Sequence, residues 1–298
     1  MNRQTNHHHH HHAATMNRAF GFGVLLNLLY VGVEAGYGFM ADSLALLTDA
    51  GHNLSDVLGL LLAWGASWIA SRKASDQHTY GYSRATILAS LLSALLLMLV
   101  VGAIVWEAVS RIKTPVATPG MILIVVAGIG VLINAGTAML FVRGKDHDLN
   151  IRGAYLHMTA DAAVSLGVVV AGVAILKTGW LWIDPAVSLL IAAVIFYSTW
   201  GLLRDSIKLT FDGVPPHIQL SDVRSYLRGV PGVQDVHDLH VWAMSTSETA
   251  LTAHLVMAAM PEEDDLLMQV NRQLDERFNI SHSTLQIETA QQHICPDH

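Results

Sequence analysis

Two histidine–aspartate pairs stand inside stretches of the sequence that are otherwise apolar. His52 and Asp56 lie in "LLTDAGHNLSDVLGLLLAW", and His157 and Asp161 lie in "YLHMTADAAVSLGVV". Each aspartate follows its histidine by four residues, a spacing that places both side chains on one face of a helix. A charged side chain at the centre of a bilayer costs on the order of 3 kcal/mol, so these aspartates require a partner. Sharing a divalent cation would provide one.

The types of these four side chains favour zinc among the divalent cations. Imidazole nitrogen and carboxylate oxygen at tetrahedral positions suit Zn²⁺, whereas an all-oxygen cage suits Mg²⁺ or Ca²⁺. The alternative interpretation is that each pair is a hydrogen-bonded clamp between helices. Recurrence of the pair at identical spacing on two segments favours the metal site. We therefore predict that His52, Asp56, His157 and Asp161 bind one Zn²⁺.

Further polar residues lie near these pairs or in other apolar segments. Asp49 precedes His52 by three residues and shares its helix face. We expect Asp49 to line an aqueous entrance or to accept a hydrogen bond from His52, and Asn53 to pack against a neighbouring helix. Glu34 and Asn134 are candidates to line the same cavity. For both residues the alternative is a role in helix packing alone.

The composition predicts that these residues sit in an integral membrane protein. The chain of 298 residues is 52% hydrophobic and only 14% charged, against roughly 25% charge in an average soluble domain. A net charge of -7 leaves no basic surplus of the kind that binds nucleic acid. Residues 18–204 form the predicted membrane domain. Its six apolar segments are each long enough to cross a bilayer, for which about 20 residues suffice; they are 19–40, 43–70, 85–110, 121–142, 153–176 and 183–203.

The basic residues near these segments predict the orientation of the chain. Six spans place both termini on one side, where Lys and Arg are in excess. The residues on the terminal side are Arg18, Arg72, Lys73, Arg84, Arg143, Lys145, Arg152, Arg204 and Lys208, against Arg111, Lys113 and Lys177 opposite. The positive-inside rule therefore predicts a multi-pass protein of the inner (plasma) membrane with cytoplasmic termini. Within the first 17 residues, the run His7–His12 is either a purification tag or a metal-collecting tail.

The pattern changes after Asp205, and residues 205–298 form a predicted soluble domain. "HIQLSDVRSYLRGV" has helical periodicity, "VQDVHDLHVWAM" and "ETALTAHLVM" alternate as strands do, "PEEDDLLMQVNRQLDERF" is amphipathic, and "STLQIET" alternates again. This α-β-β-α-β order predicts a small α+β domain with its helices on one face of a sheet. Cys295 is the chain's single cysteine, so an internal disulfide is excluded.

A metal site buried in a bilayer is catalytic, structural or a site of transport. A membrane-bound zinc hydrolase of the intramembrane protease class would carry HEXXH, which the sequence lacks. Gly51, Gly59, Gly153 and Gly167 flank the predicted ligands and allow helices to approach closely or to flex. These features favour transport over catalysis. A zinc sensor anchored by its spans is the second alternative, but such a sensor has no need of buried ligands.

The chain resembles the cation diffusion facilitator family, and in particular its zinc-exporting members. The resemblance runs from about Arg18 to the end and rests on "ADSLALLTDAGHNLSD", "HTYGYSRATILA", "LHMTADAAVSLGVV", "IDPAVSLLIA" and "VHDLHVW…LTAHLVM…HSTLQIE". The family's HXXXD motif on its second and fifth spans maps onto the two pairs described above, an arrangement typical of Zn²⁺ and Cd²⁺ carriers. The resemblance also implies a homodimer, a ferredoxin-like cytoplasmic domain, and exchange of cytosolic Zn²⁺ for external H⁺.

The same resemblance implies a second metal site in the cytoplasmic domain. His237, His254 and Glu288 match positions that bind regulatory Zn²⁺ in family members. His240 and His282 are further candidate ligands there. A strand histidine is also commonly a surface residue, so a site is predicted from the group and not from any single member.

Two features of the cytoplasmic loop and its surroundings bear on the same comparison. Asp76 and His78 resemble a peripheral metal site found in some members, with a solvated loop as the alternative. The chain departs from the family after "YGYSRA", where Thr86 stands in place of a frequent glutamate. This difference concerns charge interactions at the cytoplasmic end of the third span and not the predicted transport site.

Overall fold

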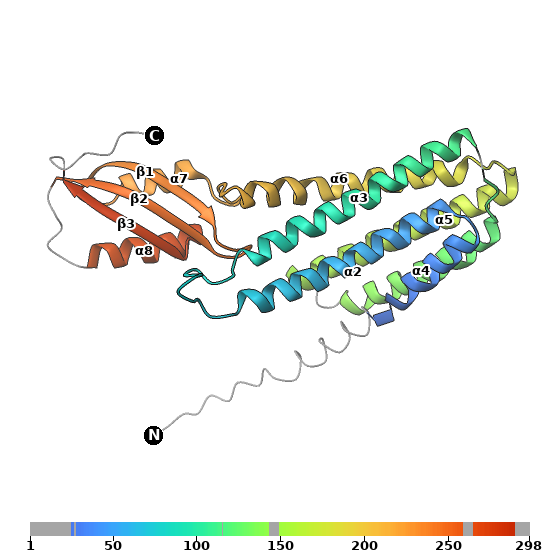
Figure 1. Cartoon of the computed structure of the whole chain (residues 1–298), viewed down its shortest axis with the longest axis horizontal. Helices are drawn as coiled ribbons and strands as arrows, with labels where there is room; N and C mark the ends of the chain where they lie inside the picture. Colours follow the sequence, from blue (N-terminus) through green and yellow to red (C-terminus); the bar gives the residue numbers. More distant parts are fainter. Residues whose placement is uncertain (1–24, 27, 115, 143–148, 259–264, 290–298) are drawn as a thin grey trace, which may run out of the picture. The chain divides into compact units, whose positions relative to one another are not determined.

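The computed structural model describes residues 25–26, 28–114, 116–142, 149–258 and 265–289 (Figure 1). Residues 28–40 are helical and are called here the N-terminal helix segment. The long helices that follow are α2 (Leu44–Ala70), α3 (Ala85–Lys113), α4 (Gly120–Phe141), α5 (Leu149–Thr178) and α6 (Ile183–Thr210). Within the described residues, five helices are long and apolar enough to cross a membrane. The first predicted span, residues 19–40, begins outside the described residues.

The helices agree with the predicted apolar segments at most ends and exceed them where polar residues continue the helix. α2 and α4 begin and end within one residue of the predicted bounds. α6 continues to Thr210, past the predicted end at Leu203, because "RDSIKLT" is helical without being apolar. Hydropathy marks the part of a helix that suits lipid, whereas backbone hydrogen bonding decides where the helix ends.

The chain divides into two compact units, each of which contains parts of several helices. The first comprises residues 1–58 and 96–199 and is called here the helical unit. The second comprises residues 59–95 and 200–298 and is called the sheet unit. The division passes through α2, α3 and α6, so those helices contribute to both units.

Small residues and one buried carboxylate hold the helical unit together. A Cβ added to Gly120 of α4 would lie 2.6 Å from the carbonyl oxygen of Gly172 of α5, so only glycine allows these two backbones to approach as they do. Asp184 of α6 is 1% exposed and caps the beginning of α2. Its carboxylate accepts hydrogen bonds from Ser43 Oγ at 2.9 Å and from the backbone N–H of Leu44 at 2.8 Å. This cap fixes the first turn of the helix that carries His52.

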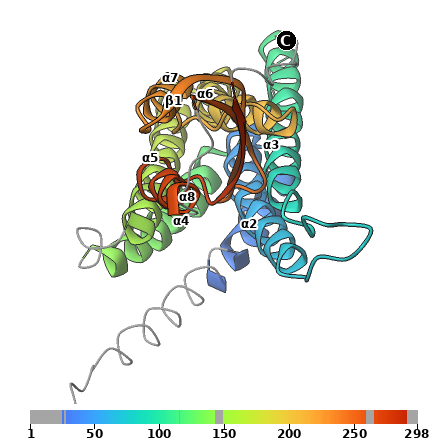
Figure 2. The same cartoon turned by 90° about the vertical axis from the view of Figure 1, so that its left-hand side faces the viewer.

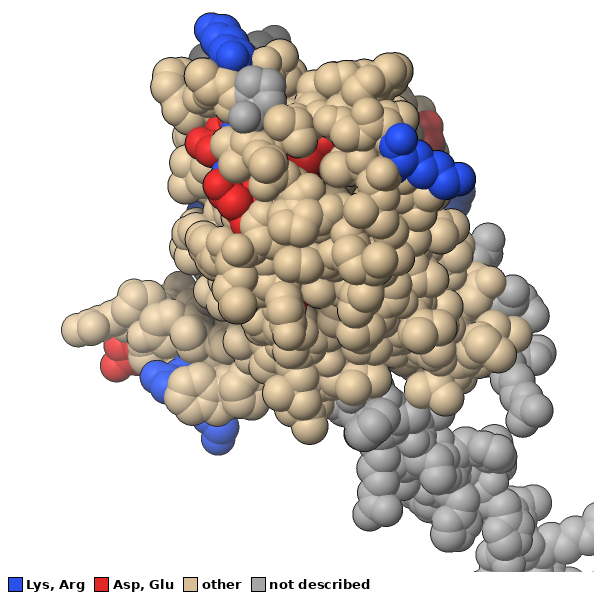
Figure 3. All heavy atoms as spheres, turned by 90° about the vertical axis from the view of Figure 1, so that its right-hand side faces the viewer, with Lys and Arg blue, Asp and Glu red and all other residues tan. Residues whose placement is uncertain are grey.

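The outer surface of the helices is apolar. Trp106 is 80% exposed and Leu132 is 74% exposed, and both face outward from long helices. The space-filling view in Figure 3 shows a surface on which Lys, Arg, Asp and Glu occupy only a few places. Exposed apolar area on this scale is costly in water and favourable in lipid. The helices therefore form a membrane-type domain.

A three-stranded sheet and two helices form the C-terminal part of the sheet unit. The elements are α7 (Leu220–Arg228), β1 (Val233–Ala243), β2 (Thr249–Met257), α8 (Asp265–Phe278) and β3 (His282–Thr289). The strand order is β1-β2-β3, with β1 antiparallel and β3 parallel to β2. Val223 and Leu227 of α7 and Leu274 of α8 share one buried core with the strands. Both helices therefore cover the same face of the sheet (Figure 2), as the sequence predicted.

The register of the strands decides which side chains share the other face. His237 of β1 pairs directly with His254 of β2, and His254 pairs with Gln286 of β3. Glu288 lies two residues beyond Gln286, so it faces the same way. The ladder between β1 and β2 is irregular after His237, where Asp238 has a φ of +48°. This irregularity turns the strand just beyond the first histidine.

Candidate metal centres

The first candidate centre is a ring of four side chains from α2 and α5 in the helical unit. His157 Nε2 lies 3.2 Å from Asp56 Oδ2, and His52 Nε2 lies 3.7 Å from Asp161 Oδ1. The contacts within each helix are 3.5 Å for His52 and Asp56 and 3.6 Å for His157 and Asp161. Because each histidine is followed by its aspartate one turn later, the two pairs face each other between the helices, and Asp161 contacts His52 through Oδ1 and His157 through Oδ2. The structure thus brings the four predicted residues together.

The separations between neighbouring donor atoms of the ring can be compared with those around a tetrahedral zinc ion. Asp56 Oδ2 and Asp161 Oδ2 are buried and make no hydrogen bond among the described residues. Ligand atoms about 2.0 Å from a tetrahedral Zn²⁺ lie about 3.3 Å from one another, close to the four observed separations. No three of the donor atoms lie within 4.8 Å of one another in this part of the chain. The ring is therefore wider across its diagonals than a closed zinc site.

Exposure varies around the ring. The Asp161 side chain is 2% exposed and that of His52 is 15% exposed, whereas that of His157 is 43% exposed. One wall of the ring is thus sealed by the helices and the opposite wall is open. The open side of the ring, at His157, is therefore the side on which solvent reaches the four side chains.

The structure places Asp49 differently from the sequence prediction. Its side chain is fully buried and does not line an entrance, and His52 Nδ1 forms no hydrogen bond among the described residues. The carboxylate instead accepts a hydrogen bond at 2.8 Å from Ser165 Oγ of α5 and one at 3.4 Å from Asn53 Nδ2. The reason is helix packing: Asp49 faces α5, whose Ser165 follows Asp161 by one turn.

Glu34 and Asn134 are also fully buried. Glu34 Oε1 accepts a hydrogen bond at 2.7 Å from the hydroxyl of Tyr30, one turn earlier in the N-terminal helix segment. Neither Tyr30 nor Ser165 was a predicted site residue. The spacing of four residues, which led to the candidate metal ligands, also occurs here. Tyr30 and Glu34 stand at i and i+4, and Ser165 follows Asp161 at the same spacing.

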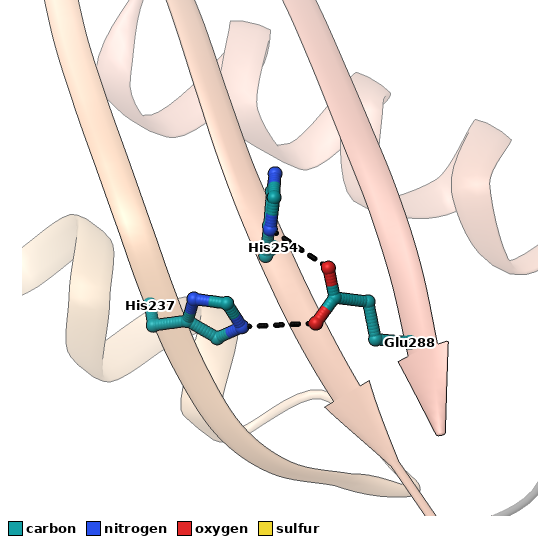
Figure 4. Close-up of side chains that lie close together, drawn as sticks. All are labelled: His237, His254 and Glu288. Carbon is teal, nitrogen blue, oxygen red and sulfur yellow. Dashed lines mark hydrogen bonds and ion pairs between the residues drawn. The ribbon is translucent and has the colours of Figure 1, made fainter. Parts of the chain in front are cut away.

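The second candidate centre is formed by one residue from each strand of the sheet (Figure 4). His237 Nε2 lies 3.1 Å from Glu288 Oε2, and His254 Nδ1 lies 2.9 Å from Glu288 Oε1. The donor atoms of His237, His254 and Glu288 all lie within 4.8 Å of one another. Their side chains are 11%, 15% and 7% exposed. Two imidazoles and one carboxylate in this arrangement match the donor set of a zinc site with a further open position.

Neighbouring side chains hold parts of this second centre in place. Gln286 Nε2 donates a hydrogen bond of 2.9 Å to Glu288 Oε1. His240 lies outside the centre, with its Nε2 at 2.8 Å from Asp238 Oδ1. The His240 ring holds the pKa of the Asp238 carboxyl below its ordinary value, because the hydrogen bond favours the ionised form. Gln286 was not a predicted site residue, although it shares its face of β3 with Glu288.

The structure does not bring His282 together with the other three residues of this centre. His282 begins β3 and pairs with Ala250, whereas Glu288 lies near the other end of the strand. Six residues of a strand span about 20 Å, so sharing a face does not bring these side chains together. The His282 ring instead packs edge-on against Tyr80, with ring centroids 5.6 Å apart.

The loop residues Asp76 and His78 are exposed. His78 stacks on Tyr82 with ring centroids 4.6 Å apart. In the described part of the chain, neither Asp76 nor His78 belongs to a group of three donor atoms close enough to hold a metal ion. This favours the solvated loop over the peripheral metal site.

Comparison with known proteins gives two family matches that together span most of the chain. The profile of the cation efflux transmembrane domain matches residues 22–209, and that of the cation efflux protein cytoplasmic domain matches residues 215–290. The resemblance stated from the sequence motifs is thereby confirmed.

Individual relatives agree with these matches. The "Cadmium, cobalt and zinc/H(+)-K(+) antiporter" of Bacillus subtilis (strain 168) is 37% identical over 87% of this chain and 85% of its own length. The "Zinc transporter ZitB" of Escherichia coli (strain K12) is 34% identical over 90% of this chain and 86% of its own. A solved metal-bound C-terminal domain of the CzcD transporter from Cupriavidus metallidurans is 33% identical, covers 24% of this chain and 99% of its own, and has a TM-score of 0.23. The chain belongs to the cation efflux family, also called the cation diffusion facilitator family.

Proposed function

We propose that this chain exports zinc from the cytosol in exchange for external protons, with Cd²⁺ as a further candidate cargo. The observation that carries the proposal is the ring of His52, Asp56, His157 and Asp161, whose neighbouring donor atoms lie 3.2 to 3.7 Å apart. The names of the relatives, which include zinc and cadmium transport and proton exchange, support the choice of cargo and counter-ion.

Competition for the same side chains couples the two ions. A histidine must be neutral and an aspartate ionised to bind a metal ion, so protons and Zn²⁺ exclude one another at the ring. Unperturbed histidine changes its charge near physiological pH, which allows loading from the cytosol and release when protons arrive from outside. The coupling requires no further chemistry, and the chain acts as a carrier and not as an enzyme.

Alternating access would follow from tilting of the helices around the ring. The sealed wall at Asp161 and the open wall at His157 are the asymmetry that such a movement would reverse. In this proposal residues 19–40 form a sixth span, the protein lies in the plasma membrane, and both termini are cytoplasmic. The excess of Lys and Arg on the terminal side supports that orientation.

Residues 205–298, which carry the sheet, would serve as a cytoplasmic dimerisation and regulatory domain of ferredoxin-like form. Its α-β-β-α-β order and the match to the family's cytoplasmic domain support this role. Zn²⁺ held by His237, His254 and Glu288 would join all three strands and stabilise the domain when cytosolic zinc is high. His237 and His254 would supply imidazole nitrogens, and Glu288 a carboxylate that Gln286 orients.

A zinc sensor is the competing function, because the second centre is the more tightly gathered of the two. Zinc uptake into proteoliposomes with an imposed pH gradient separates the two readings. We expect Asp161→Ala to abolish uptake while zinc binding to the sheet unit persists, and the exposed loop variant Asp76→Ala to transport normally. Equal uptake by Asp161→Ala and the unaltered protein would refute transport through the ring.

A further inference from the structure

A cluster of buried polar side chains lies one helical turn from the ring and contains none of the four proposed ligands. It comprises Tyr30, Glu34, Asp49, Asn53 and Ser165, and is called here the Glu34 cluster. Glu34 and Asp49 are both fully buried, and Asn53 is 1% exposed. Glu34 lies within interaction range of Asp49 and Asn53. Two carboxyl groups from different helices thus share a space closed to water.

Counting hydrogen-bond donors shows which carboxyl oxygen lacks a partner. Asp49 Oδ2 accepts from Ser165 Oγ at 2.8 Å, and Asp49 Oδ1 accepts from Asn53 Nδ2 at 3.4 Å. Glu34 Oε1 accepts from the Tyr30 hydroxyl at 2.7 Å. Glu34 Oε2 is buried and has no hydrogen-bond partner among the described residues. Both oxygens of Asp49 therefore accept a hydrogen bond, as those of an ionised carboxylate do. In Glu34 only one of the two oxygens accepts one.

The charge of the cluster requires a proton at that oxygen. No lysine or arginine of the described residues forms an ion pair with Glu34 or Asp49. Two adjacent buried carboxylates without a cation repel one another and lose their hydration, and both effects favour the protonated form of one of them. We propose that Glu34 Oε2 carries a proton facing Asp49, and that this proton leaves the protein when a divalent cation enters the ring.

The position of the cluster explains why the cation would expel the proton. Asp49 stands three residues before His52 on α2, and Ser165 stands four residues after Asp161 on α5. The cluster is therefore adjacent to the ring on both helices. A double positive charge in the ring stabilises a nearby negative charge through a medium with little screening. The titratable groups that face the pair are Tyr30 beside Glu34, and His52 and Asp161 beyond Asp49.

The step itself is a proton transfer with a simple balance. The O–H bond at Glu34 Oε2 breaks, the proton is transferred out of the cluster to bulk water as hydronium, and Glu34 remains as a carboxylate. The cation adds two positive charges to the region while the cluster loses one. By linkage the effect is reciprocal, so protonation of Glu34 from the other side weakens cation binding. The inference rests on the proposed binding of Zn²⁺ by the ring and adds a proton carrier outside it.

Gly130 of α4 leaves the room that the cluster needs. A Cβ at this position would collide with the hydroxyl of Tyr30 and would lie 3.1 Å from Ser165 Oγ. Any larger residue would therefore displace the hydroxyl that bonds Glu34. The cluster is thus enclosed by four elements: the N-terminal helix segment, α2, α4 and α5.

The test is the number of protons released when Zn²⁺ binds to the full-length protein in detergent micelles, measured with an indicator dye in weak buffer. Glu34→Gln keeps the shape and accepts the Tyr30 hydrogen bond but has no ionisable proton to release. We expect it to bind Zn²⁺ and to release about one proton fewer per ring than the unaltered protein. Glu276→Gln, a matched change at an exposed position of α8, should release the full number. Protons displaced from His7–His12 and from the second centre are common to all variants and cancel.

Equal proton release by Glu34→Gln and the unaltered protein would overturn the inference. Should Glu34→Gln fail to fold, infrared difference spectra of the unaltered protein decide the question. The carbonyl band of a buried carboxylic acid should be present without zinc and disappear on binding, and a spectrum without that change also overturns the inference. Asp161→Ala tests the proposed function separately, because zinc-evoked proton release that is undiminished by this change would show that the ring is not the site.

Discussion

His157 Nε2 lies 3.2 Å from Asp56 Oδ2, and this contact between α5 and α2 is shorter than either contact within a helix. The other contact between these helices, from His52 Nε2 to Asp161 Oδ1, is the longest of the four at 3.7 Å. Because both contacts cross between helices, a metal ion bound there would hold α2 and α5 at a fixed separation.

Removal of the His157 imidazole should reduce zinc affinity severely. We expect His157→Ala to weaken zinc binding by more than the roughly 10–100-fold lost when an outer hydrogen-bond partner of a ligand is removed. Competition with a zinc-binding dye measures this best in a Glu288→Gln background, which disables the second centre. His217→Ala, at an exposed position, is the control. Similar affinities for the two histidine variants would contradict a ligand role for His157.

Ser165→Ala should destabilise the helical unit by leaving Asp49 Oδ2 without its hydrogen bond. A buried polar group that loses its partner costs about 1–3 kcal/mol. Ser198→Ala is a suitable comparison, because Ser198 Oγ bonds only the carbonyl of Ile195 in its own helix, at 2.9 Å. Thermal unfolding in micelles should show the larger loss for Ser165→Ala. The reverse order would mean that the bond between α5 and α2 contributes little.

Asp184→Ala should loosen the start of α2. The change leaves the hydroxyl of Ser43 and the backbone N–H groups of Leu44 and Ala45 without their acceptor. Each such group costs about 1–3 kcal/mol when it stays buried. Hydrogen exchange should rise at the first turn of α2, whereas Asp275→Ala, an exposed change in α8, should leave that turn protected. Unchanged exchange at Leu44 would show that the cap is dispensable.

Glu288→Gln should abolish stabilisation of the sheet unit by zinc. A ligand present at 100 times its dissociation constant adds about 2.7 kcal/mol to the free energy of unfolding. We expect zinc to raise the unfolding temperature of this unit in the full-length protein and in His282→Ala, but not in Glu288→Gln. The response of His282→Ala distinguishes a centre made of His237, His254 and Glu288 from one that also includes His282. If zinc no longer raised the unfolding temperature of His282→Ala, His282 would be a ligand of this centre.

The sequence predicts local relationships well, because they follow from the period of a helix or a strand. The spacing of four residues placed His52 with Asp56 and His157 with Asp161 before any packing was known. The order of helices and strands after residue 205 was likewise predictable from periodicity. Each of these inferences needs only neighbours along one element.

Relationships between elements could not be predicted from periodicity. Ser165 as the partner of Asp49 depends on how α5 packs against α2. Asp184 as the cap of α2 depends on a contact between residues that are about 140 positions apart in the chain. The separation of His282 from Glu288 has the same origin, since alternation gives the face of a strand but not the distance along it.

The equal division of donors between two helices has a mechanical consequence. Each helix supplies one histidine and one aspartate, one turn apart, so a slip of α5 along α2 changes both contacts between the helices at once and leaves the contacts within each helix as they are. A single residue's rise of about 1.5 Å exceeds the tolerance of a metal–ligand bond, which is about 0.2 Å. If the ring holds the transported ion, a slip of one residue is therefore enough to break its coordination between the two helices, and release would be abrupt and not gradual.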